Sequence, residues 1–189
     1  MLMDRIIGAF TFRKGVYADV EKDTSFTQTA WILVAVIAFL SQLGSKARVG
    51  VSISDWLIGS IAGTVAALIG FAIAALIISW VGRAVFNAEV TFDELVRTLG
   101  LAFIWNIVGF LGILGFISGL NCLVGPIIFL AWILGLVAWF IAAKEALDLE
   151  WLQTIVTVFL GWLAWFIIML ITNAILGLIG ITASSIFGL

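Results

Sequence analysis

Long apolar runs separated by short charged segments organise this chain. Residues 101–143 contain no Asp, Glu, Lys or Arg. A bilayer core about 30 Å thick needs roughly 20 apolar residues per helix, so this run has room for two membrane spans and a turn. Gly, Ser, Asn and Pro gather between residues 115 and 126, which places the turn there. The pattern therefore predicts a helical hairpin inside the membrane.

Further apolar runs flank this hairpin on both sides. Together they predict an all-α, polytopic integral membrane protein with five transmembrane helices in a domain of residues 25–189. The five predicted spans cover approximately residues 28–44, 56–82, 94–116, 123–143 and 149–176. Residues 177–189 are uncharged and too few to span again.

Residues 1–24 predict an amphipathic helix ahead of the first span. They lack the order of charged start, apolar middle and small-residue end that marks a cleaved signal peptide. Apolar side chains recur at three- and four-residue steps over residues 3–20. Such a helix lies either in the headgroup layer or packed across the end of the bundle, and we favour the first. The predicted membrane-surface contacts are then Phe10, Arg13, Lys14 and Tyr17.

This interpretation has a testable form. Deleting residues 1–22 is expected to leave the bundle inserted and to remove its association with lipid or with a partner.

Two loops carry signals for the start of a helix. Thr91 and Glu94 have the spacing of a capping box, in which each side chain accepts a hydrogen bond from the other residue's amide. The third span is therefore expected to begin near Phe92. A cation site made of these acidic residues is the less economical alternative. Asp148 is expected to cap the fifth helix in the same way.

Small and amide side chains within the spans are expected to pack helices together. Gly59 and Gly63 are four residues apart and Gly70 continues the ridge, which lets another helix approach closely, although glycine is common in membrane helices generally. Asn106 and Asn173 are amides at membrane depth. Each either lines a pathway or hydrogen-bonds a neighbouring helix, and the second is the commoner use.

Composition removes most catalytic chemistry. The chain is 64% hydrophobic and 11% charged, with no histidine and one cysteine. The commonest general base and the usual haem and zinc ligands are therefore missing, and no internal disulfide is possible. No Asp, Glu, Lys or Arg lies in the part of any predicted span that crosses the hydrocarbon core, which argues against proton-coupled transport and against membrane aspartyl catalysis. We expect a non-enzymatic protein with no catalytic residue, metal or cofactor, although quinone, carotenoid or lipid contact with its many aromatic residues stays open.

The basic residues predict the orientation of the chain. With five spans, seven of the nine Lys and Arg lie on the side of the amino terminus, and only Lys46 and Arg48 lie on the other. Because cytoplasmic loops carry an excess of Lys and Arg, the amino terminus is predicted to be cytoplasmic and the carboxyl terminus exoplasmic. The net charge of −2 and the scattered basic residues speak against a nucleic-acid partner.

Three segments carry a family resemblance. They are residues 5–12 (RIIGAFTF) followed by Tyr17 and residues 23–26 (DTSF), residues 91–102 (TFDELVRTLGLA), and residues 144–147 (KEAL). In this order they resemble prokaryotic members of the Yip family, the Ypt-interacting membrane proteins. The resemblance implies a five-helix domain with a cytoplasmic amino terminus, and its eukaryotic relatives act in vesicle trafficking and bind prenylated GTPases. The Asp-Leu-Tyr-Gly-Pro segment of those relatives is absent here, so the sequence does not support GTPase binding.

The function expected from these observations is to organise or scaffold a membrane through helix–helix, lipid and protein contacts. The expected partners are membrane lipids and other membrane proteins or further copies of the chain, in the plasma (inner) membrane if the protein is prokaryotic. One alternative is an accessory subunit that docks through the glycine ridge of the second span. Another is a small carrier or channel, which requires a continuous polar cavity past Asn106 and Asn173.

Overall fold

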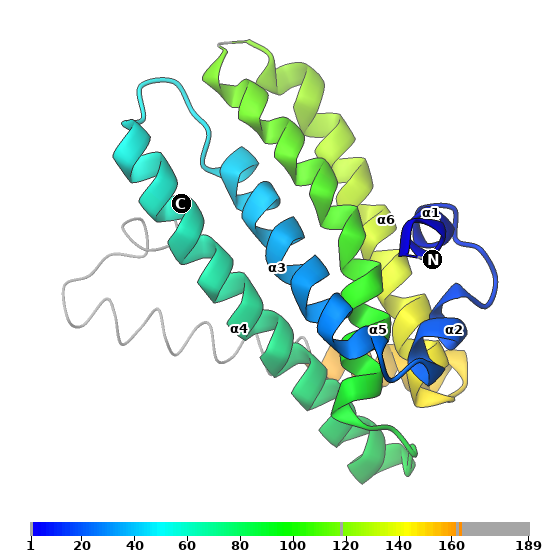
Figure 1. Ribbon diagram of the computed structural model, residues 1–189. Coiled ribbons are helices and arrows are strands. Elements are labelled where there is room, and N and C mark those ends of the chain that lie inside the picture. The colour runs from blue at the N-terminus through cyan, green and yellow to red at the C-terminus, as the bar shows by residue number, and fades with distance from the viewer. Residues whose placement is uncertain (1, 118, 162, 164–189) are drawn as a thin grey trace, which may run out of the picture.

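The structure is a computed structural model that describes residues 2–117, 119–161 and 163. Its helices are α1 (Leu2–Phe10), α2 (Val16–Lys22), α3 (Phe26–Ser45), α4 (Ile53–Phe86), α5 (Phe92–Ala102), η1 (Phe103–Phe116) and α6 (Asn121–Leu147), followed by the helix Trp151–Gly161. In Figure 1, the long helices α3, α4, α5 with η1, and α6 lie lengthwise beside one another, and α1 and α2 lie against one end. We call this the capped end. There α3 and α5 begin, and α4 and α6 end.

Four helical segments are long and apolar enough to cross a membrane: Phe26–Ser45, Ile53–Phe86, Phe92–Phe116 and Cys122–Leu147. They correspond to the first four predicted spans, with most ends extended by a few residues. Two of these helices, α4 and α5, begin in the polar residues ahead of their apolar runs, where a side chain caps the first turn. At the start of α4, for example, the Ser52 hydroxyl accepts a hydrogen bond from the Asp55 amide at 3.1 Å. The chain is an all-α, polytopic integral membrane protein.

The fifth predicted span, residues 149–176, is described only in its first part. Trp151–Gly161 is a shorter apolar helix, and the remainder of the span, with Asn173, lies outside the described residues. The expectation for Asp148 was wrong. Instead of capping this helix, Asp148 ends α6 in the left-handed conformation with φ of 49°. Aspartate is among the non-glycine residues that tolerate this conformation. Asp148 therefore stands at the end of α6 and not at the start of the next helix.

The amino-terminal segment forms two short helices rather than one. The break falls between α1 and α2, where Phe12 and Gly15 adopt positive φ angles of 51° and 82°. Both helices turn apolar side chains inward, so that Ala9, Val16 and Val20 belong to the same buried cluster as the bundle. Residues 1–24 therefore share the core of the transmembrane domain. Deleting residues 1–22 would open that core, so the deletion does not isolate a surface contact.

The helix α5 is the centre of the capped end. Every residue from 95 to 102 is buried, because α5 packs against α2, α3, α4 and α6. At Phe103 the helix tightens into η1, a 3₁₀ helix of 14 residues. In a 3₁₀ helix, residues three apart lie on one face. Gly109 and Gly112 therefore face α3 together, where a Cβ atom on Gly112 would come within 2.8 Å of the Gly44 carbonyl oxygen.

Candidate functional site

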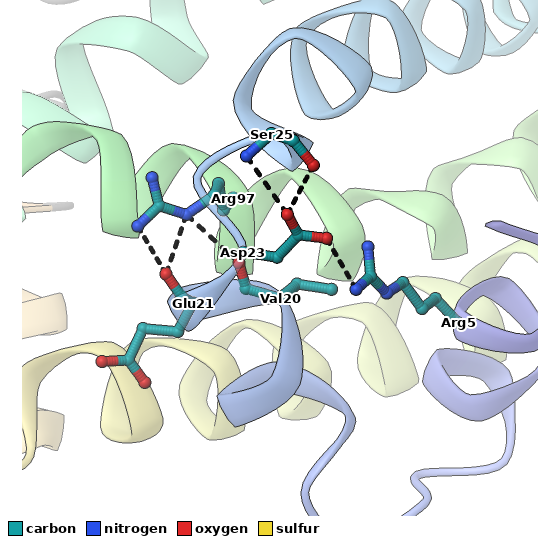
Figure 2. Close-up of polar contacts among 6 residues, drawn as sticks. All are labelled: Arg5, Val20, Glu21, Asp23, Ser25 and Arg97. Carbon is teal, nitrogen blue, oxygen red and sulfur yellow. Dashed lines mark hydrogen bonds and ion pairs between the residues drawn. The ribbon is translucent and has the colours of Figure 1, made fainter. Parts of the chain in front are cut away.

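Arg97 ties the amino-terminal segment to the bundle. This α5 residue is only 4% exposed. Its Nε atom donates to the carbonyl oxygens of Val20 and Glu21 at 3.1 and 2.9 Å, and its Nη2 atom donates to the Glu21 oxygen as well (Figure 2). Its Nη1 atom donates to the Thr27 hydroxyl at 3.1 Å. The guanidinium therefore joins α2, α3 and α5.

The Arg97 acceptors explain why a charge is stable there. The last four carbonyl groups of any helix have no partner within the helix, and they form the negative end of its dipole. Val20 and Glu21 lie in the last turn of α2. A buried cation that hydrogen-bonds to these carbonyls satisfies them and neutralises the dipole, which compensates in part for its own loss of hydration.

A second group of polar contacts fixes the loop between α2 and α3. Arg5 of α1 forms an ion pair with Asp23 at 2.8 Å (Figure 2), and its guanidinium lies 4.9 Å from the centre of the Phe26 ring. The Asp23 carboxylate also accepts hydrogen bonds from the Ser25 amide and hydroxyl at 3.1 and 2.5 Å. The Ser25 hydroxyl, and then Arg5, hold the pKa of Asp23 below its usual value.

The outer face of α1 is apolar and exposed. Met3 and Ile7, one helical turn apart, are 65% and 55% exposed. The inner face is fixed to the bundle, because the Phe10 ring packs edge to face on the Trp105 ring at 5.0 Å between centres. We call Leu2, Met3 and Ile7 the α1 stripe. Met3 and Ile7 belong to the apolar pattern of residues 3–20, but that pattern alone did not separate the outward from the inward side chains.

The four predicted membrane-surface residues occupy different environments. Arg13 and Lys14 are exposed, and the Arg13 guanidinium makes two hydrogen bonds to the Asp4 carboxylate at 2.9 and 3.0 Å. Phe10 is half-buried against the bundle. A surface contact is wrong for Tyr17, which is 2% exposed because α2 presents it to the core. Burial raises the pKa of the Tyr17 hydroxyl.

The Glu21 carboxylate lies in an acidic neighbourhood at the capped end. Burial, and then the negative charges of Asp148 and Glu94, raise the pKa of Glu21 above its ordinary value. Among the described residues, no group of three or more Cys, Asp or Glu side chains is placed to hold a metal ion.

Neutralising this carboxylate is expected to stabilise the protein near neutral pH. A carboxyl group whose pKa is raised on folding binds more protons in the folded state, so its contribution to stability falls as pH rises from about 4.5, the ordinary value, through the raised value. We expect Glu21→Gln to remove this fall while leaving the Glu21 backbone contact with Arg97 intact. Unfolding in detergent at pH 4.5 and pH 8 measures the difference. Asp19→Asn, which removes the same charge at an exposed position of α2, is the control, and an equal effect of both variants contradicts the prediction.

A cavity of about 710 Å³ lies between α4, η1 and α6 at membrane depth. Its lining is almost entirely apolar, with small residues such as Gly70 and Gly135 beside Trp132 and Trp139. Asn106 supplies an amide to this lining, and its Nδ2 atom donates to the Phe103 carbonyl at 3.0 Å. The described lining is not the continuous polar path that a carrier or channel requires.

The other predicted packing and capping residues are placed as follows. A Cβ atom on Gly63 would overlap the Gln42 amide of α3, whereas one on Gly59 would lie 3.9 Å from the Lys46 side chain. Gly70 is among the residues that line the cavity. The Thr91 amide donates to the Glu94 carboxylate at 2.6 Å, and the Glu94 amide donates to the Thr91 hydroxyl at 3.3 Å, so the capping box is present at the start of α5.

Sequence reasoning missed the partners of Arg97. Its acceptors are mainly backbone carbonyls more than 70 residues earlier in the chain, and backbone carbonyls carry no sequence signal. The available signal was a lone arginine among apolar residues in the first turns of a span.

Several apolar helices with their charges gathered at the ends define a polytopic helical membrane protein. Within that class, residues 7–172 match the model of the Yip1 domain family. The chain belongs to the Yip1 domain family. No curated protein and no solved structure matches it.

Proposed function

We propose that the protein is a non-enzymatic membrane scaffold, whose bundle holds α1 and α2 in a fixed position at the cytoplasmic surface. The observation that carries this proposal is the geometry of α1, which exposes the α1 stripe while its other face is docked on the bundle. The Yip1 domain family consists generally of non-enzymatic membrane trafficking proteins, which supports the same class of function.

The proposed contact is with lipid at the headgroup layer. An amphipathic helix binds there by burying its apolar face, and full burial of a Leu, Ile or Met side chain contributes about 1.5–3 kcal/mol. Lys14 is exposed near this helix and adds attraction to anionic lipid. Because the inner face of α1 is already packed, the contact needs no further folding. The same surface is available to another membrane protein or to a second copy.

The orientation and location are part of the proposal. The excess of Lys and Arg at the capped end supports a cytoplasmic amino terminus and an exoplasmic carboxyl terminus. The resemblance of residues 5–12 and 91–102 to prokaryotic relatives supports a prokaryotic-type member in the plasma (inner) membrane.

A fluorophore on α1 tests the lipid contact. In a Cys122→Ser background, Met3→Cys is labelled with an environment-sensitive dye in vesicles containing brominated lipid. We expect blue-shifted emission and strong quenching, because position 3 points away from the bundle. Asp19→Cys, on the exposed side of α2 and outside the stripe, is the matched control. Equal, weak quenching at both positions contradicts lipid contact by α1.

Loss of partners is tested separately. The double variant Met3→Glu with Ile7→Glu is expected to insert and fold normally, because both positions are exposed, but to lose lipid or protein partners that co-purify with the wild type in mild detergent. Mass analysis of the purified complexes measures this. An unchanged set of partners would argue against the scaffold proposal.

A further inference from the structure

Arg13, in the loop after α1, folds back onto that helix and pairs with Asp4. Its Nη1 and Nη2 atoms donate to the two carboxylate oxygens of Asp4 at 2.9 and 3.0 Å. A Cβ atom on Gly8 would lie 3.2 Å from both the Nε and the Cζ atom of Arg13. The fork formed by Nη1 and Nη2 is therefore occupied by Asp4, while the Nε side of the guanidinium lies against α1.

The pair of Asp4 and Arg13 borders the α1 stripe. Residues four apart lie in one row along a helix, and consecutive residues are about 100° apart around it. Met3 and Ile7 form one such row, and Asp4 belongs to the next. The Asp4 and Arg13 side chains are 63% and 43% exposed, and Lys14 is exposed as well. A lipid whose chains contact the α1 stripe therefore brings its headgroup to this pair.

We propose that Asp4 makes the α1 contact selective for anionic phospholipid, because its carboxylate occupies Arg13 until a headgroup phosphate displaces it. This inference rests on the proposed lipid contact of the α1 stripe and names the lipid. A phosphate accepts the same two parallel hydrogen bonds from a guanidinium as a carboxylate does, so it fits the fork that Asp4 leaves. The displaced carboxylate is solvated by water, and an exposed ion pair contributes little to stability.

The charge balance explains why the displacing lipid is anionic. The hydrogen bonds from Arg13 hold the pKa of Asp4 below its ordinary value, so the carboxylate is ionised and the pair carries no net charge near neutral pH. Because Asp4 belongs to the same chain, it competes at a high effective concentration. An anionic surface repels Asp4 and attracts Arg13 and Lys14 together. A zwitterionic headgroup carries its own cation, which opposes this attraction.

Quenching of a dye by two brominated lipids tests the selectivity. The full-length protein with Cys122→Ser and Met3→Cys carries the dye on the α1 stripe, in vesicles of phosphatidylcholine with a small fraction of phosphatidylglycerol. Bromine is placed on the phosphatidylglycerol in one preparation, and on an equal amount of the phosphatidylcholine in the other. The ratio of the two quenching efficiencies measures the local enrichment of anionic lipid.

Removing the Asp4 carboxylate is expected to raise this ratio about threefold, because Arg13 then binds the headgroup and each cation at an anionic surface strengthens the attraction several-fold. Asp4→Asn makes this change, and Asp4→Ser repeats it with a shorter uncharged side chain. Asp19→Asn is the matched control, since it removes the same charge from an exposed position of α2. We expect a much smaller rise for the control, and little effect of Asp4→Asn in an Arg13→Gln background.

Each outcome decides the proposal. A large rise with Asp4→Asn that disappears in the Arg13→Gln background supports it. Equal rises for Asp4→Asn and Asp19→Asn, an undiminished rise in the Arg13→Gln background, or a fall with Asp4→Asn overturns it. Strong quenching with the same ratio in every variant overturns the selectivity and leaves the lipid contact standing. Weak quenching by both lipids contradicts the lipid contact itself, and the selectivity with it.

Discussion

Replacing Arg97 with methionine is expected to lower the free energy of unfolding by about 3 kcal/mol. Methionine fills similar space but donates no hydrogen bond. The carbonyls of Val20 and Glu21 and the Thr27 hydroxyl then lose a charged donor, and such hydrogen bonds contribute about 1.5–3 kcal/mol each, not additively. Replacing a buried charge with an apolar group is often neutral when its partners are replaced too. Here backbone carbonyls are partners, and they cannot be removed.

Unfolding in mixed detergent micelles measures this loss, and the rate of trypsin cleavage at Lys14 and Lys22 reports whether α1 and α2 detach. Arg83→Met is the control, because Arg83 is exposed and, among the described residues, its Nε atom donates within α4, to the Ser79 carbonyl at 3.3 Å. Arg97→Lys is expected to be intermediate, since an ammonium group does not reproduce the fork geometry of guanidinium. Equal stability of Arg97→Met and the wild type would show that apolar packing alone holds α1 and α2 against the bundle.

Substituting Gly44 with alanine is expected to force α3 and η1 apart. A Cβ atom on Gly44 would overlap the Gly109 carbonyl oxygen and lie 3.0 Å from the Phe110 Cα atom. These are backbone atoms, so they cannot rotate out of the way as a side chain does. Overpacking of this kind costs about 1–3 kcal/mol, and more where backbone must shift.

Gly59→Ala is the matched control, because among the described residues its new methyl group meets only the Lys46 side chain, at 3.9 Å. Gly59 lies within α4, where alanine is about 1 kcal/mol more favourable than glycine. The two substitutions are therefore expected to change stability in opposite directions in the same unfolding assay. Similar effects of both would mean that α3 and η1 are not in backbone contact at Gly44.

The first four spans were predictable because their signal is length and apolarity, which the bilayer imposes on any helix that crosses it. The capping box of Thr91 and Glu94 was predictable because both partners lie within four residues. The 3₁₀ helix η1 was not, since its glycines fit close packing in an α-helix equally well. The break at Phe12 and Gly15 was not predictable either, because apolar residues recur at helical spacing on both sides of it and so predict one continuous helix.

The exposed α1 stripe and the cavity beside Asn106 were predictable only in part, because both depend on contacts between distant segments of the chain. Sequence periodicity identifies that α1 is amphipathic, but both of its faces carry apolar side chains. Phe10 meets Trp105 through an approach of segments about 95 residues apart, and that approach decides that Met3 and Ile7 remain outside. The depth of Asn106 was visible in the sequence, whereas the cavity in front of it depends on the positions of three helices.

The Arg97 contacts also constrain the order of assembly during synthesis. The acceptors on α2 are made 76 and 77 residues before the arginine that binds them, so two long helices must be synthesised before the last turn of α2 gains this donor. The helices α1 and α2 are thus synthesised first, but they are among the last parts of the capped end to complete their native contacts. A growing chain stalled before residue 97 is expected to leave this segment open to proteases and chaperones, and one extended past α6 is not.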